Sequence, residues 1–148
     1  MGEVNKVVAR FLDGSTLKGT TEDFSALRPT FHLHGVGETS SREIQCAKLK
    51  AVFFVKDLSG DPTRKDIPGF PPTSSVGQGK RISVQFRDGE ILCGTTMAYS
   101  AERTGFFMAP ADDQGNNIRV YVLKHAATKI AVGAPADALA QMAQARAA

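Results

Sequence analysis

The sequence is poor in the features that mark enzymes, membrane proteins and secreted proteins. It has three histidines, no Gly-x-Ser-x-Gly motif, and no residue pair that stands out as a general acid and base. No segment approaches the roughly 20 apolar residues that cross a membrane, and the first residues lead into a strand pattern without a secretory signal. We therefore expect a non-enzymatic cytoplasmic protein that works without a cofactor.

Cysteine is scarce, and positive charge is only slightly in excess. The spacing of Cys46 and Cys93 matches neither a zinc site nor a redox motif, which favours two free thiols in a reducing compartment. The 18 lysines and arginines are scattered and face 15 aspartates and glutamates, so no basic stripe for a phosphate backbone is present. With 42% hydrophobic residues, the chain has enough apolar material for a core.

The sequence does contain a repeat. A shift of 75 positions aligns residues 11–31 with residues 86–106, with 11 identities in 21 ungapped positions. Unrelated segments would almost never match this well, and self-similarity at a fixed shift marks duplicated units. The sequence therefore predicts an internal duplication, with one copy at 6–55 and the other at 81–132.

Each copy has the pattern of a β-hairpin. Apolar residues alternate with polar or long ones at 7–11 and again at 82–86, which is the period of a half-buried strand. An Asp-Gly pair follows each segment, as Asp13-Gly14 and Asp88-Gly89. Asp-Gly between alternating segments predicts a type I′ turn, because both of its central residues have positive φ.

A glycine in the second strand of each copy, Gly19 or Gly94, indicates a bulge or sharp bend that curls the sheet toward closure. About five short strands per copy favour a barrel over a sandwich. We therefore expect a mainly β protein with two tandem SH3-like or Sm-like barrels and a C-terminal alanine-rich helix. The expected divisions are a barrel at 1–56, a Pro/Gly-rich linker at 57–80 pinned at Ile67 and Phe70, a second barrel at 81–133, and a frayed or docking helical tail at 134–148.

Arg28 and Arg103 occupy equivalent places in the two copies and are the preserved residues least explained by folding. We favour a structural role, in which each guanidinium bonds the carbonyls of the adjacent bend or a local carboxylate. The alternative is an anion-binding site, with Lys48 and Lys50 as supporting charges. These four residues are the ligand-binding candidates.

His32 and His34 lie two apart on a predicted strand and could present two imidazoles on one face to a metal ion. The second copy has Phe107 and Ala109 at these places, so the repeat does not preserve the pair. We regard a metal site as a weak candidate and favour exposed or interface histidines.

Apolar residues on both faces of one strand indicate a contact between the copies. By alternation, one face of 49–55 takes Leu49, Ala51, Phe53 and Val55, and Val52 and Phe54 point the other way. Phe107 repeats this pattern in the second copy, and Cys93 is at an outward position. We expect these outward residues to pack between the copies; the alternative is that they cover a partner. The interface candidates are Val52, Phe54, Phe107 and Cys93.

The pattern Val-x-Phe-x-Asp-Gly-x-x-Leu-x-Gly-Thr-Thr-x-x-Tyr-Ser-x-x-Arg-x-Gly-Phe-Phe, together with Leu-Lys-Ala-Val-Phe-Phe-Val, resembles an uncharacterised bacterial domain family of unknown function. The resemblance covers nearly all of 6–132. Each half is also similar to the first motif of Sm-like barrels, in which an Asp-Gly turn precedes a glycine in a bent strand. Where Sm proteins place an aspartate and an asparagine for RNA contact, this chain has Ser25 or Ser100 and no matching asparagine. The resemblance implies barrel-like units and supplies no activity.

The function that these features favour is a binding or adaptor module that acts through protein–protein contacts in the bacterial cytoplasm. We expect a protein partner or self-association, and no membrane contact. The alternative is a nucleic-acid or nucleotide-binding module, including a receptor for cyclic nucleotides, that uses Arg28 and Arg103. Salt-dependent binding of oligonucleotides would favour that alternative.

Overall fold

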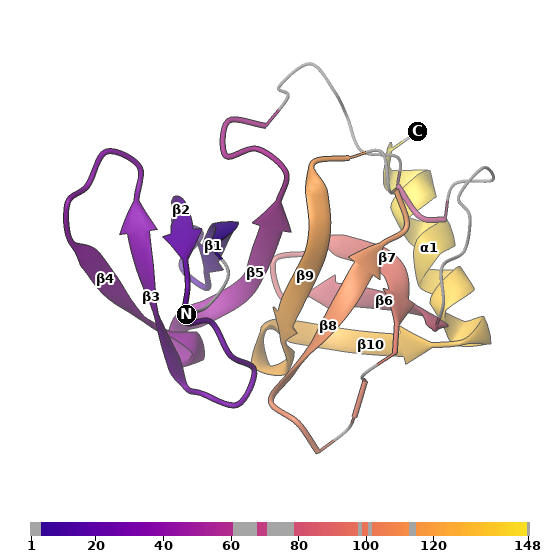
Figure 1. Cartoon of the computed structure of the whole chain (residues 1–148). Helices are drawn as coiled ribbons and strands as arrows, with labels where there is room; N and C mark the ends of the chain where they lie inside the picture. Colours follow the sequence, from indigo (N-terminus) through magenta and orange to yellow (C-terminus); the bar gives the residue numbers. More distant parts are fainter. Residues whose placement is uncertain are drawn as a thin grey trace.

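The computed structural model describes residues 4–60, 68–70, 79–97, 99–100, 102–112 and 115–147. It is mainly β, with one sheet of ten antiparallel strands in the order β10-β6-β7-β8-β9-β5-β1-β2-β3-β4, and a C-terminal helix (Figure 1). The first half comprises β1 (Asn5–Phe11), β2 (Thr16–Thr21), β3 (Thr30–Gly35), β4 (Ser41–Gln45), a 3-10 turn (Cys46–Lys48) and β5 (Leu49–Val55). The second half comprises β6 (Lys80–Phe86), β7 (Ile91–Thr96), β8 (Gly105–Pro110), β9 (Asn117–Leu123), a 3-10 turn (Lys124–Ala126), β10 (Ala127–Val132) and α1 (Ala134–Ala147).

The two halves have the same strand order and register. Within each half the order is fifth, first, second, third and fourth strand. The partners Val7 and Gly19 of β1 and β2 correspond to Ile82 and Gly94 of β6 and β7. No ladder among the described residues joins β4 to β5 or β9 to β10, so neither half closes into the expected barrel by strand pairing. Instead β5 pairs with β9 and makes one continuous, open sheet.

The Asp-Gly turns differ from the expected type I′ geometry. Gly14 and Gly89 have φ values of 90° and 93°, whereas no described non-glycine residue has a positive φ. The Gly14 amide donates to the Phe11 carbonyl at 3.1 Å, and the Asp13 carboxylate accepts the amide of Ser15 at 2.8 Å. Asp13 therefore keeps a negative φ because its side chain fixes the turn, and only the glycine adopts the left-handed conformation.

The glycines inside β2 and β7 permit a close approach between strands. A Cβ atom on Gly19 would lie 2.0 Å from the His34 carbonyl oxygen, and one on Gly94 would lie 1.9 Å from that of Ala109. No register shift occurs at either glycine; the shifts among the described strands lie between β1 and β5, between β10 and β6, and between β5 and β9. These glycines are required because the neighbouring strand's backbone lies too close for a side chain.

The two halves join through the strand pair β5 and β9, and each of these strands contributes side chains to the cores of both halves. All seven residues of β5 are buried. Ala51, Phe53 and Val55 enter the core of the second half, whereas Val52 and Phe54 enter the core of the first. In β9, Val120 and Val122 enter the second core, and Tyr121 and Leu123 enter the first. Figure 1 shows β5 and β9 side by side in the middle of the molecule.

This arrangement corrects the expected facing of 49–55. Leu49 does not share a face with Ala51, Phe53 and Val55, because the register of β1 and β5 shifts between Arg10 and Phe11. Of the four residues expected on one face, Ala51, Phe53 and Val55 belong to the core of the second half, whereas Leu49 belongs to the core of the first. Sequence alternation cannot detect such an exchange. It shows which residues share a face of a strand, but not which half of the molecule covers that face.

The C-terminal helix docks on the second half rather than fraying. The side chain of Leu139 is buried against β10 and β7, and Ser83 Oγ donates to the Ala136 carbonyl at 2.8 Å. Phe70 packs near this contact, with the Arg81 guanidinium 4.8 Å from its ring centroid. The other expected pin of the linker, Ile67, lies outside the described residues. Among the described helices, none has the length and apolar character that crossing a membrane requires.

We predict that Phe53→Ala lowers the free energy of unfolding of the whole chain by about 3–5 kcal/mol, because it opens a cavity in the core of the second half. Ile118→Ala removes an exposed side chain from β9 and is expected to change it by less than about 0.5 kcal/mol. Equilibrium unfolding in denaturant measures both values. A Phe53→Ala variant as stable as Ile118→Ala would contradict the shared core.

Candidate functional site

A groove of about 540 Å³ lies where the two halves meet. It is lined by the loop between β2 and β3, by the 3-10 turn before β5, and by β9 with the turn that follows it. We call it the junction groove. Its lining residues are Ala26, Leu27, Arg28, Pro29, Thr30, Gln45, Cys46, Ala47, Thr104, Tyr121, Leu123 and His125.

An aromatic cluster fixes the loop that forms one wall of the groove. The ring of Phe24 lies edge-on to Phe31 and Phe54 of the first half and to Phe107 and Tyr121 of the second, with centroid distances of 5.1 to 6.0 Å. Edge-to-face packing of this kind adds about 0.5–1.5 kcal/mol per pair beyond the buried area. Phe24 therefore holds its loop against both halves at once.

The bend after Phe24 is closed by serine and backbone groups. Ser25 Oγ accepts the amide of Leu27 at 3.2 Å, and the Ser25 carbonyl accepts the amide of Arg28 at 3.2 Å. The second half repeats both contacts at Ser100. This turn projects Leu27 into solvent with 86% of its surface exposed, beside Arg28 at the rim of the groove.

One wall of the groove includes Cys46, Tyr121 and His125. Burial raises the pKa of the Cys46 thiol, and burial likewise raises the pKa of the Tyr121 hydroxyl. A hydrogen bond with Thr104 and the charge of Arg103 act on Tyr121 in the opposite direction without reversing the shift. His125 Nε2 lies 2.7 Å from the Leu49 carbonyl and donates to it, since a carbonyl only accepts. A protonated thiol is a poor nucleophile.

The charges at the groove are positive. Arg28 lines it, Arg103 is close enough to influence Tyr121, and no aspartate or glutamate is among its described lining residues. Both arginines are exposed, and neither guanidinium makes a hydrogen bond or ion pair within the described part of the chain. Within the described part of the chain, the expected bonds from these guanidinium groups to the bend or to a local carboxylate are absent; serine hydroxyls and main-chain amides hold the bend there.

The two lysine candidates have different surroundings. Lys50 is 6% exposed, its Nζ lies 2.7 Å from Asp88 Oδ2 and also bonds Glu90 Oε1, and it sits 4.6 Å from the Phe86 ring centroid. Burial raises the pKa of Asp88, but the bonds from Lys50 and the Glu90 amide outweigh this and leave it below the ordinary value of 3.8. Lys50 is therefore a link between the halves and is not open to a ligand, whereas Lys48 is exposed.

The interface candidates are divided by the sheet order. Phe54 and Phe107 lie 5.9 Å apart across the join, and the Arg119 guanidinium stacks on both rings at 4.4 and 4.7 Å. Val52 is buried in the same cluster. Cys93 lies elsewhere, because it is in β7, which β8 and β9 separate from β5. Its Sγ is 3.2 Å from Ser83 Oγ. Cys93 is therefore not among the described residues at the join of β5 and β9.

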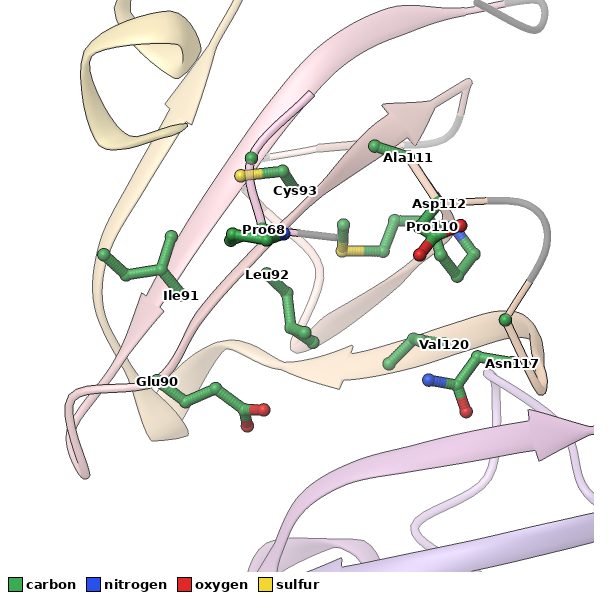
Figure 2. Close-up of a pocket in the computed structure, with 13 residues that line it drawn as sticks. Pro68, Glu90, Ile91, Leu92, Cys93, Pro110, Ala111, Asp112, Asn117 and Val120 are labelled. Carbon is green, nitrogen blue, oxygen red and sulfur yellow. The ribbon is translucent and has the colours of Figure 1, made fainter. Parts of the chain in front are cut away.

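Cys93 instead lines a second, smaller cavity in the second half. This cavity has a volume of about 210 Å³ and an apolar interior that includes Leu92, Met108 and Val120. Figure 2 shows Cys93 beside Pro68, with Glu90, Asp112 and Asn117 among the residues that line the cavity. Burial raises the pKa of the Cys93 thiol, so this cysteine is also protonated at neutral pH. The cavity belongs to one half, and its larger apolar side chains are core residues.

The two histidines of β3 line a shallow polar pocket of about 320 Å³ with Asp23. His32 Nδ1 lies 2.6 Å from Asp23 Oδ2, and the His32 amide donates to Asp23 Oδ1 at 2.8 Å. Burial raises the pKa of Asp23, but these bonds outweigh that effect and hold it below its ordinary value. The described residues contain no group of three or more histidine, cysteine or acidic side chains placed to hold a metal ion. His32 and His34 thus lack a third protein ligand there.

Sequence reasoning missed four residues of the junction: Phe24, Cys46, Tyr121 and His125. Two signals were available. The run Val120–Leu123 is apolar on both strand faces, which is typical of a strand covered on both sides. Phe24 is a large aromatic residue in a turn between strands, a place where turn residues are usually polar. Neither signal says which distant segment provides the cover.

Comparison with known proteins assigns the chain to a family without assigning an activity. Residues 3–134 match the family of unknown function DUF6982, so the chain belongs to that family. No curated protein and no solved structure matches the chain.

We predict that neutralising the two acids that bond Lys50 lowers the free energy of unfolding more than replacing Lys50 itself. Combining Asp88→Asn with Glu90→Gln leaves the Lys50 ammonium buried without a counter-charge, which is expected to lower the free energy of unfolding by about 2–4 kcal/mol. The loss is at the lower end of the range for buried pairs because the two acids are partly exposed. Lys50→Met removes the buried charge while keeping its volume and is expected to cost less than about 1 kcal/mol.

Denaturant unfolding at neutral pH compares these variants, with Lys129→Met on the exposed part of β10 as the control. Because the pKa of Asp88 is lowered in the folded chain, its contribution is present above the ordinary value of 3.8 and is lost as the pH falls through the lowered value. Lys50→Met as damaging as the double variant would contradict this account.

Proposed function

We propose that this member of DUF6982 is a non-enzymatic binding module of the bacterial cytoplasm, and that it takes a segment of a partner protein in the junction groove. The observation that carries the proposal is the pairing of an exposed apolar side chain, Leu27, with an arginine that has no acidic partner among the described residues, Arg28, at the rim of one groove. An exposed apolar site of this kind marks a contact surface rather than a reaction centre.

The lining defines the chemistry of the segment. Leu27 and Ala47 offer exposed apolar surface, while Arg28 offers a planar, permanently charged donor. No carboxylate is among the described lining residues, so an incoming carboxylate meets only cations and neutral donors. We infer a partner segment with a bulky apolar side chain next to an aspartate, a glutamate or a terminal carboxylate.

Duplication explains why the groove exists once. We infer that the chain arose from two copies of one curled, SH3-like or Sm-like β unit, in keeping with the matched registers of the halves. The groove forms where β9, the fourth strand of the second half, lies beside β5 of the first half. The equivalent strand of the first half, β4, is at the end of the sheet and has no strand beyond it among the described residues. A function of the joined pair therefore belongs at this groove.

Anion binding by nucleic acid is the second candidate, because the guanidinium groups of Arg28 and Arg103 are exposed and lack acidic partners in the described chain. Lys48 is exposed and lies in the 3-10 turn that contributes to the groove. Lys50, the fourth candidate, is engaged by Asp88 and Glu90. The remaining charge is small beside the six or more phosphate contacts typical of DNA-binding proteins, so we rank this function below protein binding.

We predict that selection from a random peptide library displayed on phage enriches peptides that carry a leucine-like side chain next to a carboxylate. Arg28→Glu is expected to weaken the selected peptides at least tenfold, because it replaces the attraction by repulsion. Lys129→Glu makes the same change of charge on β10, away from the groove, and is expected to leave affinity unchanged. Fluorescence polarisation with the labelled peptides measures both.

Peptides that bind Arg28→Glu as tightly as the unchanged chain would overturn the proposed site. Failure to enrich any peptide, together with oligonucleotide binding that weakens steeply with salt, would instead favour the nucleic-acid function. The melting temperatures of both variants should equal that of the unchanged chain, because neither side chain is buried.

A further inference from the structure

The two halves have equivalent surfaces, one on β1 and β5 and the other on β6 and β10. The first half uses its surface to contact the second half, whereas helix α1 covers the equivalent surface of the second half. In the first half, Val8 of β1 and Phe53 of β5 are paired and pack against the core of the second half. The shared register equates them with Ser83 of β6 and Ala131 of β10. Ser83 is fully buried and donates to the Ala136 carbonyl of α1. Helix α1 thus occupies the place that a whole β unit occupies in the first half.

The contacts of α1 combine a small apolar centre with polar links toward both ends. Ala136 and Leu139 pack against Ala131, with Phe70 and Ile91 at the edge. Toward the start of the helix, Arg81 Nη1 lies 3.0 Å from Asp137 Oδ1. Toward its end, Arg146 Nη1 donates to the Gly89 carbonyl at 2.7 Å. The covered face is therefore closed by a few side chains rather than by a large core.

The opposite end of the sheet is terminated in another way. The register equates Glu43 and Gln45 of β4 with Tyr121 and Leu123 of β9, the residues that enter the core of the first half. Glu43 and Gln45 are exposed. Polar and charged side chains on an end strand oppose the addition of another strand. Figure 1 shows β4 and α1 at opposite sides of the molecule.

We propose that the face of β6 and β10 under α1 is a self-association surface, and that α1 masks it. When α1 leaves, the apolar face is exposed beside the outer edge of β10, a strand that pairs only with β6 among the described strands. The occupant is a second copy of this chain. Because the β4 end is polar, the two copies meet through the same end, β10 against β10, and form a two-fold symmetric dimer.

The test uses the full chain with substitutions in α1. Leu139 is 1% exposed, so Leu139→Gln is expected to release the helix and to double the mass measured by light scattering as the concentration rises. Met142 lies on the same helix but is 42% exposed, so Met142→Gln is the matched control and is expected to remain a monomer, like the unchanged chain. In the dimer of Leu139→Gln, hydrogen exchange is expected to show fast amides in 134–147 and newly protected amides in β10.

Asp137→Arg provides a second route to release, because it places two arginines face to face without altering the apolar centre. A released helix in a chain that stays monomeric would overturn the proposal. So would a dimer whose β10 amides gain no protection, or aggregates without defined stoichiometry from both variants. A helix that stays protected in both variants would contradict the assignment of these contacts as its anchor.

Discussion

The pairing of β5 with β9 is the interaction on which the rest of the molecule depends. Backbone hydrogen bonds carry one sheet through both halves, and successive residues of each strand enter different cores. The second half therefore receives Phe53 from the first, and the first receives Tyr121 from the second. Burial of one such aromatic side chain is worth about 1.5–3 kcal/mol, a large part of the net stability of a small protein. Neither half has a complete core without the other.

The residues that differ between the halves follow from what covers each of them. The shared residues build each unit: glycine in the turn, glycine where two strands touch, and serine in the bend. Phe107 faces the join, whereas its counterpart His32 faces solvent. Ala131 lies under α1, whereas its counterpart Phe53 lies in the core of the second half. The halves therefore carry different residues where their surroundings differ.

Much of the local structure could be predicted from the sequence. Alternation located the strands, the Asp-Gly pairs located the hairpins, and the apolar pair Val52 and Phe54 indicated a covered second face. The turn type was wrong because the Asp13 side chain stabilises a turn that type I′ statistics do not describe. The places of Leu49 and Cys93 could not be predicted, for two further reasons. A register shift between β1 and β5 is invisible to alternation, and the order of strands in a sheet is a long-range property.

The groove was the least predictable part, because it combines a loop of one half with a strand of the other. Its arginine was found through the repeat, while Tyr121 and His125 were not, since they matter only when the halves meet. The central claim, that the join makes one cooperative unit, is tested most directly by native-state hydrogen exchange in increasing denaturant. The account predicts that the slowest amides of β2 and of β7 report the same free energy and the same denaturant dependence. Two separate values, with one half opening while the other stays protected, would contradict it.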